Sequence, residues 1–487
     1  MKNVKTILIM LAFWGLSVSG AYATTYIITK NASNFIVTIA GGGYLGSPDV
    51  SLQNKIDEIQ ISANGEPCTI QFGSGGSTLD LGSSPSTLIT FDGGTSGNNW
   101  GLVSLTGKAT ASNHNATIKL INHAAVDCKA EITRVVDVAG GMIIIETAGE
   151  LTISTGGIVT TTAAEDDIFT IVVRSGTLTI NGGTVRATGD YSLAIITSNA
   201  VINIIDGTVS ANAGRAIENY NSTTTVIGGT ISATTGTAIE NHNGTTTISG
   251  GTVSATTGKA VHNNGGAINI SGGTIAATGT GNAIVCYDES TVNITGGKVL
   301  AQEGYAIYIN EGGGSISGGV VFAYGEDPTD IIYNGSYGML TGNGVIIAWN
   351  KAAGTSTYEA GTSNDIFKLP ATATAKWTKQ SGNGGISYAN GTNTGFIPID
   401  GVTVEGETGI SDIETEKISI YPNPTSGQLK IENGELRIEK VEIVDVTGKT
   451  ILMSGETTID ISHLPNGTYF VKIQTESGIL VKKVIKE

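Results

Sequence analysis

The sequence predicts an all-β protein: a parallel β-helix with three short strands in each turn, followed by a small C-terminal module of different character. A step of the Gly-Gly-Thr type recurs seven times, with spacings of 24, 22, 22, 22, 24 and 22 residues. The second positions of these steps are Gly183, Gly207, Gly229, Gly251, Gly273, Gly297 and Gly319. A fixed period in this range, with Thr, Val and Ile enriched, is typical of a solenoid whose repeats each form one turn. The 69 glycines, 6% aromatic residues and 14% charged residues also favour a thin, strand-rich coil over a wide globular enzyme.

The N-terminus has the pattern of a secretory signal peptide. Lys2 and Lys5 precede an apolar run over residues 6–14, and Ala21 and Ala23 are small residues at the two positions that a signal peptidase reads. We expect cleavage of residues 1–23 before Thr24, because the apolar run is too short for a stable membrane span. No later segment is long and apolar enough to span, so we expect a soluble mature protein without a membrane span.

The segments on either side of the regular repeat lack its period. Residues 24–145 are strand-like and rich in Gly, Thr and Ser, and we expect them to form an N-terminal β cap and irregular coils. A solenoid needs its open end covered. Residues 341–404 contain Trp349 and Trp377 and lose the period, which favours a C-terminal β cap.

Residues 146–340 form the regular coil, in which apolar residues recur at one position of each of three strands. Side chains alternate across a strand, so these residues are predicted to point inward and to stack from turn to turn. The first strand contributes Val209, Ile231, Val253 and Ile275; the second Ile217, Ile239, Val261, Ile284 and Ile307; the third Val226, Ile248, Ile270, Ile294 and Ile316. β-branched residues suit such columns.

Two further columns explain how the corners of the coil are built. Asn219, Asn241 and Asn263 follow the second inward column by two residues, so they are predicted to face inward and to form an amide ladder. The Gly-Gly pairs are predicted to form tight bends, which need positive φ or the absence of a Cβ. The repeat resembles the right-handed parallel β-helices of the pectate-lyase-like class, and this resemblance implies architecture rather than activity.

The chain changes character after an acidic segment. Residues 405–417 carry five acidic residues and no apolar periodicity, which is typical of a linker. Residues 420–427 read IYPNPTSG, residues 441–449 read VEIVDVTGK, and the chain later has a turn and strand over residues 461–473 and the ending KKVIKE. Together these blocks, over residues 418–487, resemble the C-terminal sorting domain of type IX secretion cargo.

That resemblance implies a small Greek-key β-sandwich and a partner, the type IX secretion machinery. It also implies passage to the periplasm through the signal peptide, then transport across the outer membrane to the cell surface or the medium. The alternative is an ordinary adhesion-type β-sandwich, in which the prolines, glycines and Tyr469 serve turns and packing alone.

One outward column of the repeat carries titratable groups: Glu218, Glu240 and His262. Two carboxylates on adjacent turns could hold a cation or act as acid and base. The alternative is a solvated, exposed pair. Lyases of this scaffold need a Lys or Arg base beside clustered acids, whereas Arg215 and Lys259 look scattered, as does Arg186. We therefore expect no catalytic, cofactor-binding or metal-binding residues and no cofactor.

Three other features leave alternatives open. The acidic run over residues 165–167 could contact Ca²⁺ or be a solvated loop. The outward Thr-x-Ser pairs, at 208/210, 230/232 and 252/254, resemble the Thr arrays of ice-binding solenoids but stop at Thr274 and Ala276, which favours β-propensity and solubility. Cys68 and Cys128 could form a disulfide in an oxidising compartment, while Cys286, in the column of the asparagines, is expected to be a small buried residue.

The formal net charge of −16 argues against nucleic acid and anionic membranes as partners. The sequence thus predicts a secreted or cell-surface protein, adhesin-like or glycan-contacting and without catalysis, whose partner is a surface polysaccharide or a host glycan. The alternative is a polysaccharide lyase or glycoside hydrolase on the same scaffold.

Overall fold

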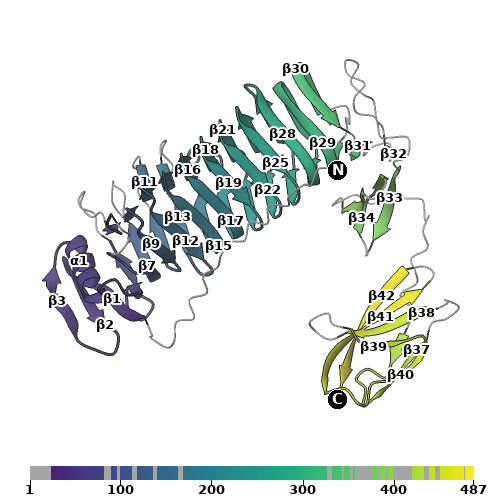
Figure 1. Ribbon diagram of the computed structural model, residues 1–487, viewed down its shortest axis with the longest axis horizontal. Coiled ribbons are helices and arrows are strands. Elements are labelled where there is room, and N and C mark those ends of the chain that lie inside the picture. Colours follow the sequence, from purple (N-terminus) through teal and green to yellow (C-terminus); the bar gives the residue numbers. More distant parts are fainter. Residues whose placement is uncertain are drawn as a thin grey trace, which may run out of the picture. The chain divides into compact units, whose positions relative to one another are not determined.

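In the computed structural model of the protein, the described residues form only strands apart from one helix (Figure 1). The chain divides into two compact units, Met1–Trp377 with Ser387–Ile397 and Thr378–Ile386 with Pro398–Glu487. The structure describes residues 23–81, 89–95, 99–111, 118–134, 140–162, 168–325, 332–342, 345–350, 355–356, 374–380, 383–390, 393–398, 419–432, 438–444, 450–475 and 478–487. The predicted signal peptide, the acidic run 165–167, the linker 405–417 and the turn at Gly448 lie outside these residues, apart from Ala23. Among the described helices, none is long and apolar enough to cross a membrane.

The chain begins with an antiparallel sheet and a helix. The sheet contains β1 (Thr24–Asn31), β2 (Asn34–Ile39) and β3 (Tyr44–Asp49), and α1 (Leu52–Ala63) follows. The expectation that residues 24–145 are strand-like throughout is therefore wrong at α1. Ser51 caps the start of the helix, because its hydroxyl accepts a hydrogen bond from the backbone amide of Asn54. The spacing of the buried Leu52 and Ile56 was the signal for it.

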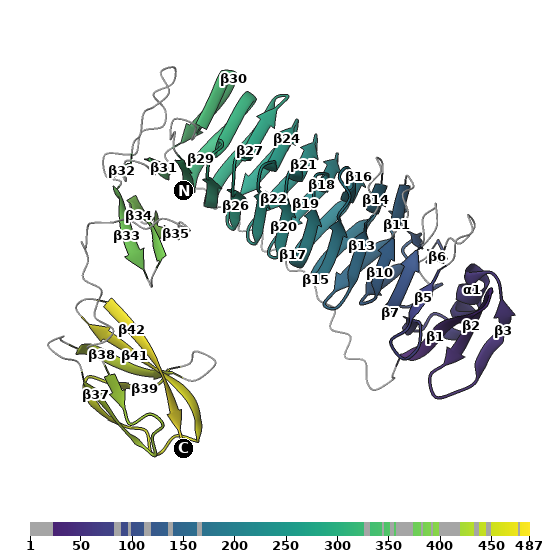
Figure 2. The same cartoon turned by 180° about the vertical axis from the view of Figure 1, so that it is seen from behind.

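The solenoid is a stack of turns, each with strands on three faces, which Figure 2 shows from behind. Face 1 contains β5 (Thr78–Asp80), β10 (Glu131–Arg134), β13 (Ile158–Thr161), β20 (Thr230–Ala233), β23 (Thr252–Ala255), β26 (Thr274–Ala277) and β31 (Val345–Asn350). Face 2 contains β6 (Ile89–Asp92), β8 (Ile118–Ile121), β11 (Gly140–Glu146), β14 (Ile168–Arg174), β16 (Leu193–Ser198), β18 (Arg215–Tyr220), β21 (Thr237–His242), β24 (Lys259–Asn264) and β27 (Asn282–Tyr287). Face 3 contains β4 (Cys68–Phe72), β9 (Ala125–Cys128), β12 (Glu150–Ser154), β19 (Thr223–Val226), β22 (Thr245–Ile248) and β25 (Ala267–Ile270).

Some longer strands continue from one face to the next. Those that run from face 3 to face 1 are β7 (Val103–Ala111), β15 (Thr177–Ala187), β17 (Val201–Ala211) and β28 (Ser290–Ala301). β29 (Ile307–Gly325) runs through all three faces, β30 (Ile332–Gly342) pairs with it in parallel, and β32 (Thr355–Ser356) pairs antiparallel with β31. β33 (Thr374–Gln380), β34 (Asn383–Asn390) and β35 (Asn393–Pro398) form a separate sheet.

The inward columns are confirmed residue by residue. On face 2, Ile217 pairs with Ile239, and Ile239 pairs with Val261, all fully buried. Thr230, predicted to point outward, is exposed. Repetition of the same apolar residue at the same position therefore gives one continuous core along the coil.

The asparagine ladder and the glycine bends are also confirmed. Asn219 donates its side-chain amide to Asn241 at 2.8 Å, and Asn241 donates to Asn263 at 2.7 Å. At the bend before β23, a Cβ on Gly250 would lie 2.0 Å from the carbonyl oxygen of Ile227, and Gly251 has φ +71°. The first glycine is needed for space and the second for its conformation.

The three cysteines are all buried and unpaired. Cys68 pairs with Val103 on the next turn, and Val103 pairs with Val126 on the turn after that, two residues before Cys128. A whole turn thus separates Cys68 from Cys128, so the possible disulfide is not formed. Cys286 pairs with Asn263 and continues the asparagine column, as the alignment of the repeats predicted.

The C-terminal module consists of two antiparallel sheets around its own core. One contains β36 (Ser419–Tyr421), β37 (Gln428–Glu432) and β40 (Thr458–Asp460); the other contains β38 (Ile438–Val444), β39 (Thr450–Ser454), β41 (Gly467–Thr475) and β42 (Gly478–Lys486). Alternate residues of β38 and β41, such as Val441 and Val471, are buried. The Tyr469 hydroxyl donates to the carbonyl of Pro465 at 2.7 Å, which fixes the turn before β41.

Candidate functional site

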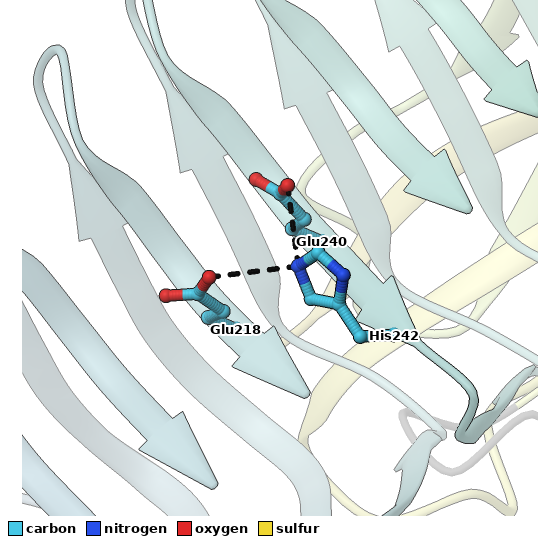
Figure 3. A group of neighbouring side chains, drawn as sticks. All are labelled: Glu218, Glu240 and His242. Carbon is cyan, nitrogen blue, oxygen red and sulfur yellow. Dashed lines mark ion pairs between the residues drawn. The ribbon is translucent and has the colours of Figure 1, made fainter. Parts of the chain in front are cut away.

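Titratable and aromatic side chains gather on the outer side of face 2. β18 and β21 pair in parallel, so Glu218 lies beside Glu240 and Tyr220 lies beside His242. β24 continues both columns with His262 and Asn264. These six residues come from three consecutive turns, and Figure 3 shows that the side chains of Glu218, Glu240 and His242 converge.

The two carboxylates are not the solvated pair that was the alternative to a functional role. Each of the two residues is 6% exposed, although both point away from the core. The reason is the neighbouring long side chains. Tyr220 donates its hydroxyl to Glu218 Oε1 at 2.8 Å, and Arg215 and the two histidines surround Glu240.

The expectation that Arg215 is scattered away from these acids is wrong. Its Nε contacts Glu240 Oε2 and lies 3.7 Å from Glu218 Oε1. Strict alternation would place Arg215 on the inward side with Ile217. Instead Ala216, between them, is also fully buried, and Arg215 lies at the start of the strand with its side chain 41% exposed. A basic group therefore lies beside the acids, whereas Arg186 lies on face 1 in β15.

His242 was missed by the sequence analysis, and its ring lies between the two carboxylates. Its Nε2 is 3.5 Å from Glu218 Oε1 and 3.3 Å from Glu240 Oε1. Its ring stacks on Tyr220 with a centroid distance of 4.5 Å and an interplanar angle of 6°. Its position two residues after Glu240 was the signal, because alternate residues of a strand share one side. The predicted His262 takes part as well, with Nδ1 3.3 Å from Glu240 Oε1.

The neighbours change the acidity of several groups. Burial alone would raise the pKa of Glu240, but hydrogen bonds from His262 and Arg215 and their charges outweigh it and hold this pKa at about 2. Burial, together with the hydrogen bond to Glu218, raises the pKa of Tyr220 to about 12. Burial also lowers the pKa of Lys259, in the column of Arg215. Glu240 is thus a carboxylate and Tyr220 a neutral phenol at neutral pH.

We call Arg215, Glu218, Glu240, His242 and His262 the charged cluster. Beyond it, face 2 continues with four tyrosines, which we call the tyrosine strip: Tyr287, Tyr305, Tyr308 and Tyr333. Tyr287 meets His262 edge to face at 5.6 Å, and its ring is 6.0 Å from that of Tyr308. Tyr308 stacks on Tyr333 at 4.5 Å and 9°. Tyr305 packs edge to face against Tyr308 and Tyr333. The cluster and the strip therefore form one continuous outer surface of polar and aromatic groups.

This surface offers hydrogen-bond donors, acceptors and flat apolar rings, which is the set of groups that a polar ligand with apolar faces requires. Glu218, Glu240 and His242 each offer one metal-ligand atom, and these atoms lie within 4.8 Å of one another. The outward Thr-x-Ser pairs lie on a different face, where Thr208, Thr230 and Thr252 stack in register.

The comparison with known families concerns the C-terminal module. Residues 419–487 match the family described as the secretion system C-terminal sorting domain. The sorting-domain prediction is confirmed. A domain of this kind implies handling by the type IX secretion machinery and export to the cell surface or the extracellular space.

The other comparisons, with solved structures and with curated proteins, add no argument. One solved structure, the crystal structure of the Acinetobacter phage vB_ApiP_P1 tailspike protein, is similar with 9% sequence identity and a TM-score of 0.26 over 89% of this chain and 76% of that chain. A likeness this distant carries no argument on function. Among curated proteins, none matches the chain.

Proposed function

We propose that the protein is an exported, adhesin-like β-helix that binds glycans through the outer side of face 2, without catalysis. The observation that carries this proposal is the tyrosine strip beside the charged cluster. Sugar rings have apolar C–H faces that pack on aromatic rings, and their hydroxyls pair with polar groups such as the half-exposed guanidinium of Arg215. Tyr333 is 39% exposed, and exposed aromatic residues on a rigid scaffold are typical of binding surfaces.

The proposal includes a route of export. The signal peptide of residues 1–23 directs the chain to the periplasm, and the sorting domain then directs it across the outer membrane. Parallel turns hold the binding side chains at fixed spacing, so binding requires little ordering of the protein. The partner is a surface polysaccharide or a host glycan.

The test is a binding screen of the mature chain, from Thr24 to Glu487, against a panel of polysaccharides. Tyr308→Ala is expected to weaken binding at least tenfold. The matched control is Tyr44→Ala, because Tyr44 is a 77% exposed tyrosine of β3 outside face 2. Equal effects of the two changes, or no binding to any glycan in the panel, would contradict the proposal.

A second candidate, a polysaccharide lyase or glycoside hydrolase, is favoured by the contact of Arg215 with Glu240, which supplies a basic group beside two acids. Incubation of the mature chain with acidic and neutral polysaccharides distinguishes the two candidates. Product formation that Glu240→Gln and Arg215→Gln abolish would replace the binding function by an enzymatic one. Binding without products supports the first proposal.

A further inference from the structure

Three potential metal ligands of face 2 are arranged around one point (Figure 3). His242 Nε2 lies 3.5 Å from Glu218 Oε1 and 3.3 Å from Glu240 Oε1. Both distances exceed the 2.7–3.2 Å or so of an N–H···O hydrogen bond. They match the separation, about 3.3 Å, of two ligands that each lie about 2.0–2.1 Å from a tetrahedral zinc ion. The two distances from His242 are thus those between ligands of one ion, and all three ligand atoms lie within 4.8 Å of one another.

The Nε2 atom of His242 is buried and has no hydrogen-bond partner. Buried polar atoms are nearly always satisfied, so one that is not needs an explanation. The Nδ1 atom of the same ring lies 3.3 Å from the side-chain amide nitrogen of Asn264. A half-turn of this amide brings its oxygen to Nδ1; that atom then carries the proton, and the lone pair of Nε2 points at the two carboxylates.

Neighbouring residues orient the three potential ligands. In known metal sites, contacts of this kind around the ligands fix their positions. The Tyr220 ring stacks on His242 and fixes the plane of the imidazole. Arg215 contacts Oε2 of Glu240, whereas Oε1 of the same carboxylate faces both His242 and His262. The guanidinium offsets one of the two carboxylate charges, so the cluster of Glu218, Glu240 and Arg215 keeps one negative charge.

We propose that Glu218, Glu240 and His242 bind a divalent transition-metal ion of the zinc type, with the remaining coordination position open to water or a ligand. The imidazole favours such an ion over Ca²⁺ and Mg²⁺, which prefer six or more oxygen ligands. Lys259 carries a positive charge close enough to act on Glu240. The site therefore binds the ion against partial repulsion, and the proposal does not depend on glycan binding.

The test uses the full mature chain, treated with a chelator, dialysed and titrated with ZnCl₂ in a calorimeter. We expect one saturable equivalent of Zn²⁺, and weaker or no binding of CaCl₂ and MgCl₂. His242→Asn is expected to weaken Zn²⁺ binding at least tenfold. Asparagine occurs at the next position of the same column, Asn264, so the coil accepts it. His123→Asn, at an exposed corner with φ +65° that asparagine tolerates, is the matched control and should leave binding unchanged.

Two further variants separate metal binding from a structural role of the cluster. Tyr220→Phe keeps the ring stacked on His242 but removes the hydroxyl that donates to Glu218 Oε1. Lys259→Gln removes the positive charge that opposes the ion. Both variants should therefore keep or tighten Zn²⁺ binding. Co²⁺ bound in place of Zn²⁺ should give a visible absorption band that His242→Asn removes. Each variant must keep the circular dichroism spectrum and melting temperature of the parent. Absence of a saturable equivalent, equal loss in His242→Asn and His123→Asn, or stronger binding of Ca²⁺ than of Zn²⁺ overturns the proposal.

Discussion

The side-chain amide of Asn241 links three consecutive turns of the coil, because it accepts from Asn219 at 2.8 Å and donates to Asn263 at 2.7 Å. All three residues are fully buried, so each amide depends on its neighbours for its hydrogen bonds. The ladder is therefore the point on face 2 where loss of one polar group leaves others unpaired.

We predict that Asn241→Ala lowers the free energy of unfolding by about 2–4 kcal/mol, because the buried amides of Asn219 and Asn263 each lose one hydrogen bond. Asn212→Ala, at an exposed position of the same solenoid, should cost under about 0.5 kcal/mol. Urea unfolding of both variants measures the difference. Similar midpoints for the two variants would show that the ladder contributes no stability.

The facing of the strands gives a second prediction. Ile239→Asp places an unpaired carboxylate in the core and should cost several kcal/mol, whereas Thr230→Asp on the exposed side of face 1 should cost under about 1 kcal/mol. Denaturant melts compare them, and comparable losses would mean that burial of Ile239 does not support the fold.

The third prediction concerns the bends at the glycine pairs. Gly250→Ala should destabilise the coil by about 1–3 kcal/mol, because the new Cβ would lie 2.0 Å from the carbonyl oxygen of Ile227. Gly43→Ala is the control, since a Cβ there meets nothing within 4 Å. Thermal melting of the two variants is the measurement, and an unchanged melting temperature for Gly250→Ala would contradict the steric argument.

A fourth prediction concerns pH. The hydrogen bond from Lys119, followed by that from Arg174, outweighs partial burial and holds the pKa of Glu146 below its usual value. A depressed pKa contributes stability that is present above the unfolded pKa of about 4.3 and is lost as pH falls through the folded value. Glu146→Gln should therefore destabilise the protein at neutral pH by under about 1 kcal/mol and make no difference at strongly acidic pH. Glu150→Gln, at an exposed position, is the control; a constant Glu146 effect at all pH values would contradict the prediction.

The fifth prediction concerns export. Truncation after Lys417 should leave the β-helix folded and protease-resistant but retained in the periplasm, because residues 419–487 match a sorting domain and have their own core. Fusion of residues 405–487 to a passenger with its own signal peptide should carry that passenger to the surface. Fractionation of the native host followed by immunoblotting measures both, and surface display of the truncated chain would contradict the assignment.

Most of the coil could be predicted from the sequence because its signal is repeated. The columns through Ile239, Val253 and Ile270 recur in every turn, so a fixed period and alternation suffice to place them. The helix α1 and part of the charged cluster could not be found in this way. The helix occurs once, and its Ser51 cap and apolar spacing are a weak signal in a segment that is otherwise rich in strand-forming residues.

The charged cluster was only half predicted for a related reason. Glu218, Glu240 and His262 stand out because they align in one column, whereas Arg215 and His242 reach the same point from other columns. Convergence of side chains from different columns depends on side-chain length and on the irregular start of β18, where two successive residues, Ala216 and Ile217, are both buried. A prediction from strict alternation of side chains takes account of neither side-chain length nor an irregular strand start.

The in-register columns of the solenoid also restrict how its length can change during evolution. Between β20 and β23, one complete turn separates each residue from its partner, as Thr230 and Thr252 illustrate. Duplication of a complete turn reproduces every inward contact, the ladder link and the bend, and the pairing of Thr274 with Lys298 shows that extra residues between strands leave the register intact. The coil therefore lengthens only by whole turns, and each turn gained shifts the distance between the N-terminal sheet and the tyrosine strip by one fixed step.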